Sequence, residues 1–126
     1  MSTGSQGKSE GQSTGVRYNS KKPPLSMILE ARHALDGCSR VMAFGAQKYS
    51  RANWRKGLSQ TEVADSLSRH LVAWLSGEDK DPETGEKHLD HLLCNAIFLA
   101  ELSYTRPDLD DRPIVDCVFV GKDVIR

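Results

Sequence analysis

The sequence has few apolar residues, no excess of either charge and no long hydrophobic run. Apolar residues make up 38% of the 126 residues, below the ~45–50% of a typical globular chain. Lysine and arginine (17) balance aspartate and glutamate (17), so net charge favours neither duplex nucleic acid nor an anionic membrane. No leader pattern is visible, and no apolar run approaches the ~20 residues of a membrane span. We therefore expect one domain, in a soluble protein of the cytoplasm.

Cysteine is scarce as well. The three cysteines, Cys38, Cys94 and Cys117, are an odd number, and no two of them have the CxxC spacing. Cys38 and Cys94 fall within helix-patterned segments, where a free thiol behaves as a small apolar group. This pattern predicts reduced cysteines in the core rather than a disulfide framework or a zinc site.

Composition sets the two ends of the chain apart from its middle. Residues 1–22 are rich in Ser, Gly, Gln and Thr and are predicted to form a flexible N-terminal tail. The last part of this tail, residues 15–22, adds an aromatic side chain and three cations, which leaves open whether it folds over an anionic ligand. Residues 107–126 are a C-terminal extension, where β-branched residues at 113–120 predict a short strand or an extended arm. The remaining residues, 23–106, are predicted to be the helical catalytic domain.

Three segments of the middle region have helical periodicity, which predicts a mainly α fold, a small bundle of three main helices. The first is expected to begin at Ser26 as N-cap and to end near Gly45. The second follows the capping box Ser59-Gln-Thr-Glu62 and ends near Gly77. The third, residues 86–104, is apolar over a wide arc, which indicates either a central position or a subunit interface. Because one small domain cannot cover so much apolar surface, we expect a homo-oligomer that associates through this third helix.

Histidines and acids gather around the connection between the second and third helices. On the third helix, His88, His91 and Asn95 are three and four residues apart and therefore share one stripe of the surface. On the second helix, His70 lies on the apolar face beside Arg69. Imidazole nitrogens and carboxylate oxygens together bind divalent metals. The acids that the connecting segment offers are Glu78, Asp79, Asp81 and Glu83.

Two familiar metal motifs do not fit this segment. An EF-hand loop beginning at Asp79 would need glycine at its sixth position, where the chain has Thr84. A phosphohydrolase of the HD type needs an adjacent His-Asp pair, and no histidine of this chain is followed by aspartate.

The connection between the first and second helices carries a second signal, because it combines cations, aromatic rings and an amide. Cations neutralise phosphates, an aromatic ring stacks on a base, and asparagine hydrogen-bonds a base edge. Beside an acidic, histidine-containing site, this segment is predicted to be the nucleotide side of a pocket. The residues concerned are Lys48, Tyr49, Arg51, Asn53, Trp54 and Arg55.

The spacing of these motifs is specific enough for a comparison with a known family. The pattern comprises Gly45-Ala-Gln-Lys-Tyr49, Asn53, Trp54, Arg69, His70, Trp74, Gly77, Glu78, Asp81, Glu83, Gly85, His88, His91 and Asn95, with Gly15, Arg17, Tyr18 and Lys21 upstream. It resembles the dATP/dGTP diphosphohydrolases encoded by some bacteriophages. The resemblance implies an enzyme related to the MazG-like all-α pyrophosphohydrolases. Such enzymes release a nucleoside monophosphate and pyrophosphate with the help of a divalent metal. For a phage protein it implies the host cytoplasm and a role in making 2-aminoadenine DNA, by depleting dATP and supplying dGMP.

The metal ligands are the point where the chain departs from MazG-like enzymes. Those enzymes carry Glu-Glu-x-x-Glu on one helix and Glu-x-x-Asp on the next, whereas this chain has no adjacent glutamates. Both Glu62-x-x-Asp65 and Glu78-x-x-Asp81 remain candidate ligand pairs.

We expect hydrolysis of purine deoxynucleoside triphosphates with Mg²⁺ or Mn²⁺, which would neutralise the triphosphate and activate a water molecule. Two alternatives stay open: a deoxynucleotide phosphatase that releases orthophosphate, and a non-catalytic nucleotide-binding or helical assembly protein. The expected catalytic residues are Glu78, His70 and Arg69. The expected metal ligands are Glu78, Asp81, His88 and His91. The expected substrate-binding residues are Lys48, Tyr49, Asn53, Trp54, Arg55 and Asn95.

Overall fold

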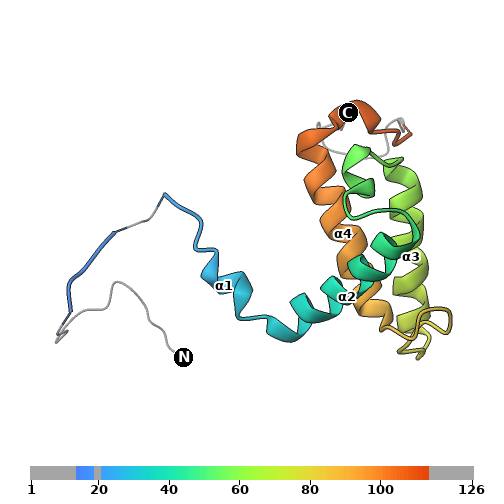
Figure 1. Ribbon diagram of the computed structural model, residues 1–126, viewed down its shortest axis with the longest axis horizontal. Coiled ribbons are helices and arrows are strands. Elements are labelled where there is room, and N and C mark those ends of the chain that lie inside the picture. The colour runs from blue at the N-terminus through green and yellow to red at the C-terminus, as the bar shows by residue number, and fades with distance from the viewer. Residues whose placement is uncertain (1–13, 19–20, 114–126) are drawn as a thin grey trace, which may run out of the picture. The chain divides into compact units, whose positions relative to one another are not determined.

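The computed structural model describes residues 14–18 and 21–113, and these form helices joined by loops (Figure 1). Among them there is no strand, only an isolated bridge between Lys80 and Lys87, and no helix long and apolar enough to cross a membrane. The mainly α fold with three main helices is confirmed. The elements are α1 (Ser26–Leu29), α2 (Arg32–Lys48), the 3₁₀ turn η1 (Asn53–Lys56), α3 (Gln60–Leu75), α4 (His88–Thr105) and the 3₁₀ turn η2 (Pro107–Leu109). Cys117, residues 114–120 of the expected strand and most of the expected tail lie outside the described residues.

The chain divides into two compact units, residues 1–31 and 32–126. In the first unit, α1 is a single turn whose N-cap is Leu25, so the expectation that Ser26 caps the helix was wrong. The expected first helix is also interrupted, because residues 30–31 are not helical between α1 and α2. The second unit contains α2, α3 and α4.

Helix α2 continues past the point where the sequence predicted its end. Gly45 stays within the helix, and its carbonyl oxygen accepts a hydrogen bond from Tyr49 N–H at 3.0 Å. A glycine in a helix costs only about 1 kcal/mol relative to alanine, which continued backbone hydrogen bonding can offset. The three further residues carry Lys48 at the C-terminal end of α2.

Helix α3 begins and ends where the sequence predicted. The Ser59 side chain accepts a hydrogen bond from Glu62 N–H at 3.3 Å. A second free N–H of this first turn, that of Thr61, donates to Asp111 at 2.9 Å, and the Ser59 hydroxyl donates to the same carboxylate at 2.6 Å. Asp111, two residues beyond η2, therefore helps to cap α3. At the other end, α3 stops just before Gly77, which has a φ of 97°, a conformation that favours glycine.

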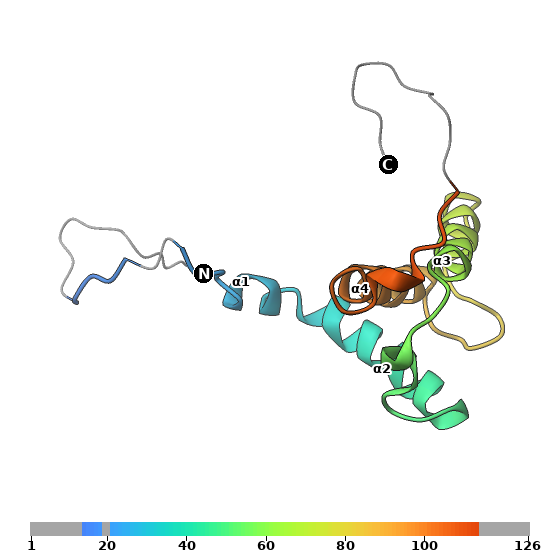
Figure 2. The same cartoon turned by 90° about the horizontal axis from the view of Figure 1, so that it is seen from above.

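Helix α4 is the central element of the second unit, because α2 and α3 both pack against it (Figures 1 and 2). The expectation that an apolar third helix takes a central position is thereby confirmed. Within the described part of the chain, the buried apolar residues come from all three helices and are Cys38, Val63, Cys94 and Leu102. Cys38 and Cys94 are free and buried, as predicted.

The absence of a side chain at Gly37 allows α2 to approach α4 closely. Both Gly37 and Asp90 are buried, and a Cβ atom on Gly37 would overlap the Asp90 carboxylate. Arg40, one turn along α2, reaches Glu86 at 3.1 Å and Asp90 at 3.9 Å. A glycine at this position therefore leaves room for a buried carboxylate between the helices.

Candidate functional site

A cleft of about 1140 Å³ runs along α4, between the second half of α2, the connection from α2 to α3, and the facing side of α3. It brings together residues that the sequence places far apart. Of the predicted site residues, all except Glu78 line this cleft. They are Lys48, Tyr49, Asn53, Trp54, Arg55, Arg69, His70, Asp81, His88, His91 and Asn95.

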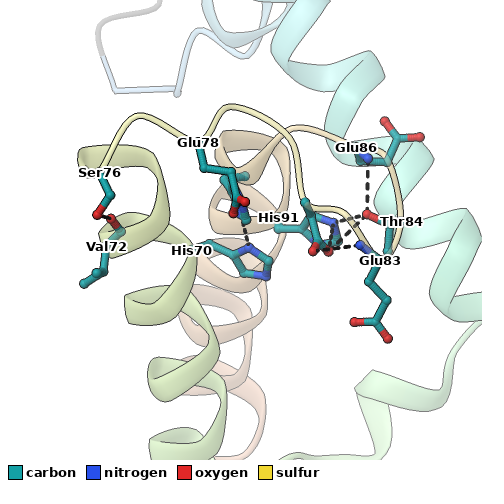
Figure 3. A network of polar contacts seen from close by, with 10 residues as sticks. His70, Val72, Ser76, Glu78, Glu83, Thr84, Glu86 and His91 are labelled. Atoms are coloured by element: carbon teal, nitrogen blue, oxygen red, sulfur yellow. Dashed lines mark hydrogen bonds and ion pairs between the residues drawn. The ribbon is translucent and has the colours of Figure 1, made fainter.

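Glu78 lies outside the cleft lining, but two histidines link it to the cleft. Figure 3 shows Glu78 on the loop that follows α3 and His70 on α3. Its Oε1 atom is 2.7 Å from Nε2 of His88, the first residue of α4. The other ring nitrogen of His88, Nδ1, is 2.8 Å from Nδ1 of His70 on α3. The side chain of His88 is 5% exposed and that of Glu78 is 52% exposed. The three side chains therefore form a chain of hydrogen bonds from the surface to the cleft.

The geometry of this chain begins in the backbone of the α3–α4 loop. The positive φ of Gly77 reverses the chain, and Glu78 N–H then donates to the carbonyl of Ala73 at 3.0 Å. Farther along, His88 N–H donates to the carbonyl of Asp79 at 2.9 Å. Both ends of the loop are thus fixed by backbone hydrogen bonds, which brings Glu78 and His88 together although ten residues separate them.

A second group of hydrogen bonds orients His91, the next histidine along α4. Its Nε2 atom is 2.8 Å from the Thr84 hydroxyl oxygen and 3.5 Å from Asp81. The Thr84 hydroxyl donates to Asp81 at 3.2 Å. The ring of His91 stacks on that of His70, with the ring centres 4.4 Å apart and the planes 4° from parallel. The loop therefore fixes His91, and His91 supports one face of His70.

The electrostatics of this region favour a neutral His70 and an ionised Asp81. Burial lowers the pKa of His70 below the usual 6.5, and the positive charge that His91 and His88 carry when protonated lowers it further. Burial alone would raise the pKa of Asp81, but hydrogen bonds from Glu83 N–H and the Thr84 hydroxyl bring it below its usual value. A neutral imidazole and a carboxylate at the same site are suited to accept a proton and to bind a cation.

Cations and aromatic rings line the rest of the cleft. None of the four cations that line the cleft forms an ion pair with another described residue. Trp54 stacks on Phe98 of α4, with ring centres 4.7 Å apart and an interplanar angle of 25°. The Arg55 guanidinium lies 5.7 Å from the centre of the Trp54 ring. The four cations are Lys48, Arg51, Arg55 and Arg69.

Asn95 and Cys94, two neighbouring residues of α4, also line the cleft. Asn95 donates to the hydroxyl of Ser66 on α3 at 3.1 Å, which fixes its amide. Burial raises the pKa of the Cys94 thiol to about 12. Because a thiol with so high a pKa is not ionised near neutrality, Cys94 is a packing residue and not a nucleophile.

Arg51, which the sequence predicted for the nucleotide side of the pocket, and Glu83, one of the acids that it singled out, also line the cleft. Thr84 and Phe98 line it too, and neither was predicted as a site residue. Thr84 and Phe98 had no sequence signal, because a threonine in a loop and an apolar residue on a helix are ordinary. The alternative ligand pair, Glu62 and Asp65, is exposed on α3 and does not line the cleft.

The donors of the cleft fit a metal that is bound together with phosphate better than a site made by protein alone. Within the described part of the chain, no group of three or more His, Cys, Asp and Glu side chains is arranged to hold a metal ion. Both nitrogens of His88 are engaged in hydrogen bonds, and so is Nε2 of His91. Asp81 and Glu83 provide carboxylates at the cleft. Mg²⁺ is commonly held by one or two carboxylates plus substrate phosphates.

The arrangement of histidines, acids, cations and a stacked tryptophan around one cleft agrees with what a comparison of sequences finds. Residues 12–112 match the model of a family described as "dATP/dGTP diphosphohydrolase, N-terminal". The chain belongs to this family. A dATP/dGTP diphosphohydrolase of Salmonella phage PMBT28 is 38% identical over 99 residues, which are 79% of this chain. The chain spans about a third (33%) of the length of that relative. No solved structure matches this member of the family.

Proposed function

We propose that the protein hydrolyses purine deoxynucleoside triphosphates, dATP and dGTP, to the deoxynucleoside monophosphate and pyrophosphate. The observation that carries the proposal is the cleft, which gathers a neutral histidine, two carboxylates, four cations and an aromatic platform along one helix. Family membership and the phage relative support the same activity.

His70 is proposed to accept the proton of the attacking water. Its ring lies in the cleft, and its lowered pKa keeps it neutral near physiological pH, the form that takes up a proton. A positioned general base contributes about 10²–10⁴-fold to a hydrolytic rate. His91 stacks on one face of the ring and limits its rotation.

The cations Lys48, Arg51, Arg55 and Arg69 are proposed to bind the phosphates. Guanidinium groups form paired hydrogen bonds with phosphate oxygens, and these four side chains are not neutralised by ion pairs with other described residues. The net charge of the whole chain is zero. The gathering of four positive charges at the cleft therefore results from the way the chain folds.

Trp54 is proposed to stack on the purine base, with Tyr49, Asn53 and Asn95 contacting the base or sugar. The stacking of Trp54 on Phe98 holds the indole ring in place. Phe98 lies seven residues beyond His91 on α4, a distance of about 10 Å along the helix axis. The base and the reacting phosphate would therefore occupy different parts of the same cleft.

We propose that Mg²⁺ or Mn²⁺ enters with the triphosphate and that Asp81 and Glu83 hold it. When bound, such an ion neutralises phosphate charge and lowers the pKa of a bound water molecule. The ligand roles expected for Glu78, His88 and His91 stay predictions. Both ring nitrogens of His88 already form hydrogen bonds, which makes Asp81 the better candidate ligand.

We propose further that the protein acts in the host cytoplasm, where it would deplete dATP and supply dGMP for 2-aminoadenine DNA. A homo-oligomer is proposed as well, because Leu89 and Tyr104 of α4 are 43% and 84% exposed and Val72 and Leu75 of α3 are 60% and 68% exposed. Light scattering of the purified protein measures its mass, and a monomer would contradict the oligomer.

The test of the activity is incubation with each of the four deoxynucleoside triphosphates and Mg²⁺ or Mn²⁺, with all phosphate products quantified. We expect pyrophosphate from dATP and dGTP in preference to dCTP and dTTP. His70→Gln should lower the rate by about 10²–10⁴-fold. His33→Gln, at an exposed histidine of α2 outside the cleft, is the matched control and should retain the wild-type rate.

Two other outcomes would replace this proposal. Orthophosphate as the product would identify a phosphatase. Thermal stabilisation by a triphosphate without any turnover would identify a non-catalytic nucleotide-binding protein.

A further inference from the structure

The chain of hydrogen bonds from Glu78 through His88 to His70 has only one arrangement of protons when both rings are neutral. A glutamate carboxylate accepts hydrogen bonds and donates none. His88 must therefore carry its proton on Nε2, which lies 2.7 Å from Glu78. A neutral imidazole has a single N–H, so Nδ1 of His88 is an acceptor.

The same reasoning extends to His70. Because Nδ1 of His88 accepts, the hydrogen bond of 2.8 Å between the two Nδ1 atoms requires the proton to be on His70. The remaining nitrogen of His70, Nε2, then carries the lone pair. When Nε2 takes up a proton, Nδ1–H continues to donate to His88, so no hydrogen bond of the chain has to be broken.

We propose that Glu78 is a positioning residue, which acts through His88 to hold His70 in the tautomer whose Nε2 is free to accept a proton. This inference rests on the proposed role of His70 and gives Glu78 a different part from the one that the sequence suggested. Glu78 would neither touch the substrate nor bind the metal, in keeping with its place outside the cleft lining.

Other groups near His70 do not supply this control. His91 packs flat on the ring and directs its own Nε2 toward Thr84 and Asp81. Asp81 and Arg69 act on His70 through charge, in opposite directions. Among the described residues, His88 is the hydrogen-bond partner of the His70 ring.

The direct test is proton–nitrogen correlation NMR of the full chain at mildly alkaline pH, which reports which nitrogen of each neutral histidine is protonated. We expect His70 protonated at Nδ1 and His88 protonated at Nε2. In Glu78→Ala, His88 loses its acceptor, so both rings should become mixtures of tautomers. Glu78→Gln can present its amide oxygen to His88 and should retain the wild-type tautomers.

Kinetics provide the second readout. Glu78→Ala should lower kcat by about 10- to 100-fold, the range known for removing a partner that orients a metal-binding histidine, and should leave KM unchanged. Glu78→Gln should lower kcat less. Asp79→Asn is the matched control, because Asp79 is the next exposed acid of the same loop and lies outside the cleft lining; kcat and the tautomers should both be those of the wild type.

The outcomes separate this inference from the proposed function. If wild-type His70 is protonated at Nε2, or if Glu78→Ala leaves the tautomers unchanged, the inference is wrong even in an active enzyme. If the protein has no turnover but His70 shows the expected tautomer that depends on Glu78, the hydrogen-bond relay stands and the proposed function fails.

Discussion

Substituting Gly37 by alanine tests the close packing of α2 against α4, on which the cleft depends. In a helix, glycine to alanine normally stabilises by about 0.5–1 kcal/mol, because the unfolded chain loses conformational freedom. At Gly37, however, the new methyl group would overlap the buried Asp90 carboxylate. Forcing extra volume into a packed interior costs typically about 1–3 kcal/mol. We therefore expect Gly37→Ala to lower the free energy of unfolding by about 1–2 kcal/mol.

Gly45→Ala is the matched control for this prediction. Gly45 lies in the same helix, and nothing stands within 4 Å of the position its Cβ would take. This variant should therefore be stabilised by about 0.5–1 kcal/mol. The difference between the two variants in urea unfolding, followed by circular dichroism, isolates the overlap with Asp90 from helix propensity.

A double-mutant cycle assigns the effect to Asp90. Replacing Asp90 by alanine removes the atoms that the new methyl group would meet. In that background Gly37→Ala should stabilise, giving a coupling energy of about 1–3 kcal/mol. The packing described here would be refuted if Gly37→Ala were as stable as Gly45→Ala, or if its effect were the same with and without Asp90.

Three further predictions follow from the site and its supports. Because His70 accepts a proton only when neutral and its pKa is lowered, kcat should rise with pH on an acid limb whose midpoint lies below 6.5; a midpoint above 6.5 in the pH–rate profile would contradict this. Trp54→Ala should weaken binding of dGTP by about 1–3 kcal/mol, the loss expected for one stacked base, and calorimetry that finds unchanged affinity would exclude Trp54 as the platform. Hydrogen bonds from Ser59 and Thr61 lower the pKa of Asp111 to about 2. Its contribution to stability is therefore present above the usual 3.8 and is lost as the pH falls toward 2. Asp111→Asn should lower the free energy of unfolding at neutral pH and reduce its loss between pH 3.8 and 2, as measured by urea titrations. An unchanged loss of stability over this pH range would show that the cap does not contribute.

The features that the sequence predicted correctly depend on local chemistry. Ser59 caps α3 because its side chain and Glu62 N–H are three residues apart, a distance that the backbone itself fixes. The central position of α4 follows from an apolar arc too wide for one neighbour. The grouping of His70, His88 and His91 follows from helical spacing on two helices that a short loop joins.

The features that were missed depend on tertiary packing or on weak local signals. Neither glycine nor proline stands at residues 30–31, so the break between α1 and α2 has no marker. Gly45 resembled a helix end, yet it continues the helix and forms no close contact. The hydrogen bond between His70 and His88 depends on how α3 packs against α4, and sequence spacing cannot specify which atoms of two rings meet.

Phosphorus NMR of dGTP and Mg²⁺ incubated with the purified protein shows whether the protein releases pyrophosphate, because every phosphate group is followed at once. We expect the triphosphate signals to be replaced by those of dGMP and pyrophosphate, with no orthophosphate. His70→Gln should slow this conversion, and His33→Gln should not. Orthophosphate as the first product, or unchanged dGTP in the presence of folded protein, would contradict the proposed function.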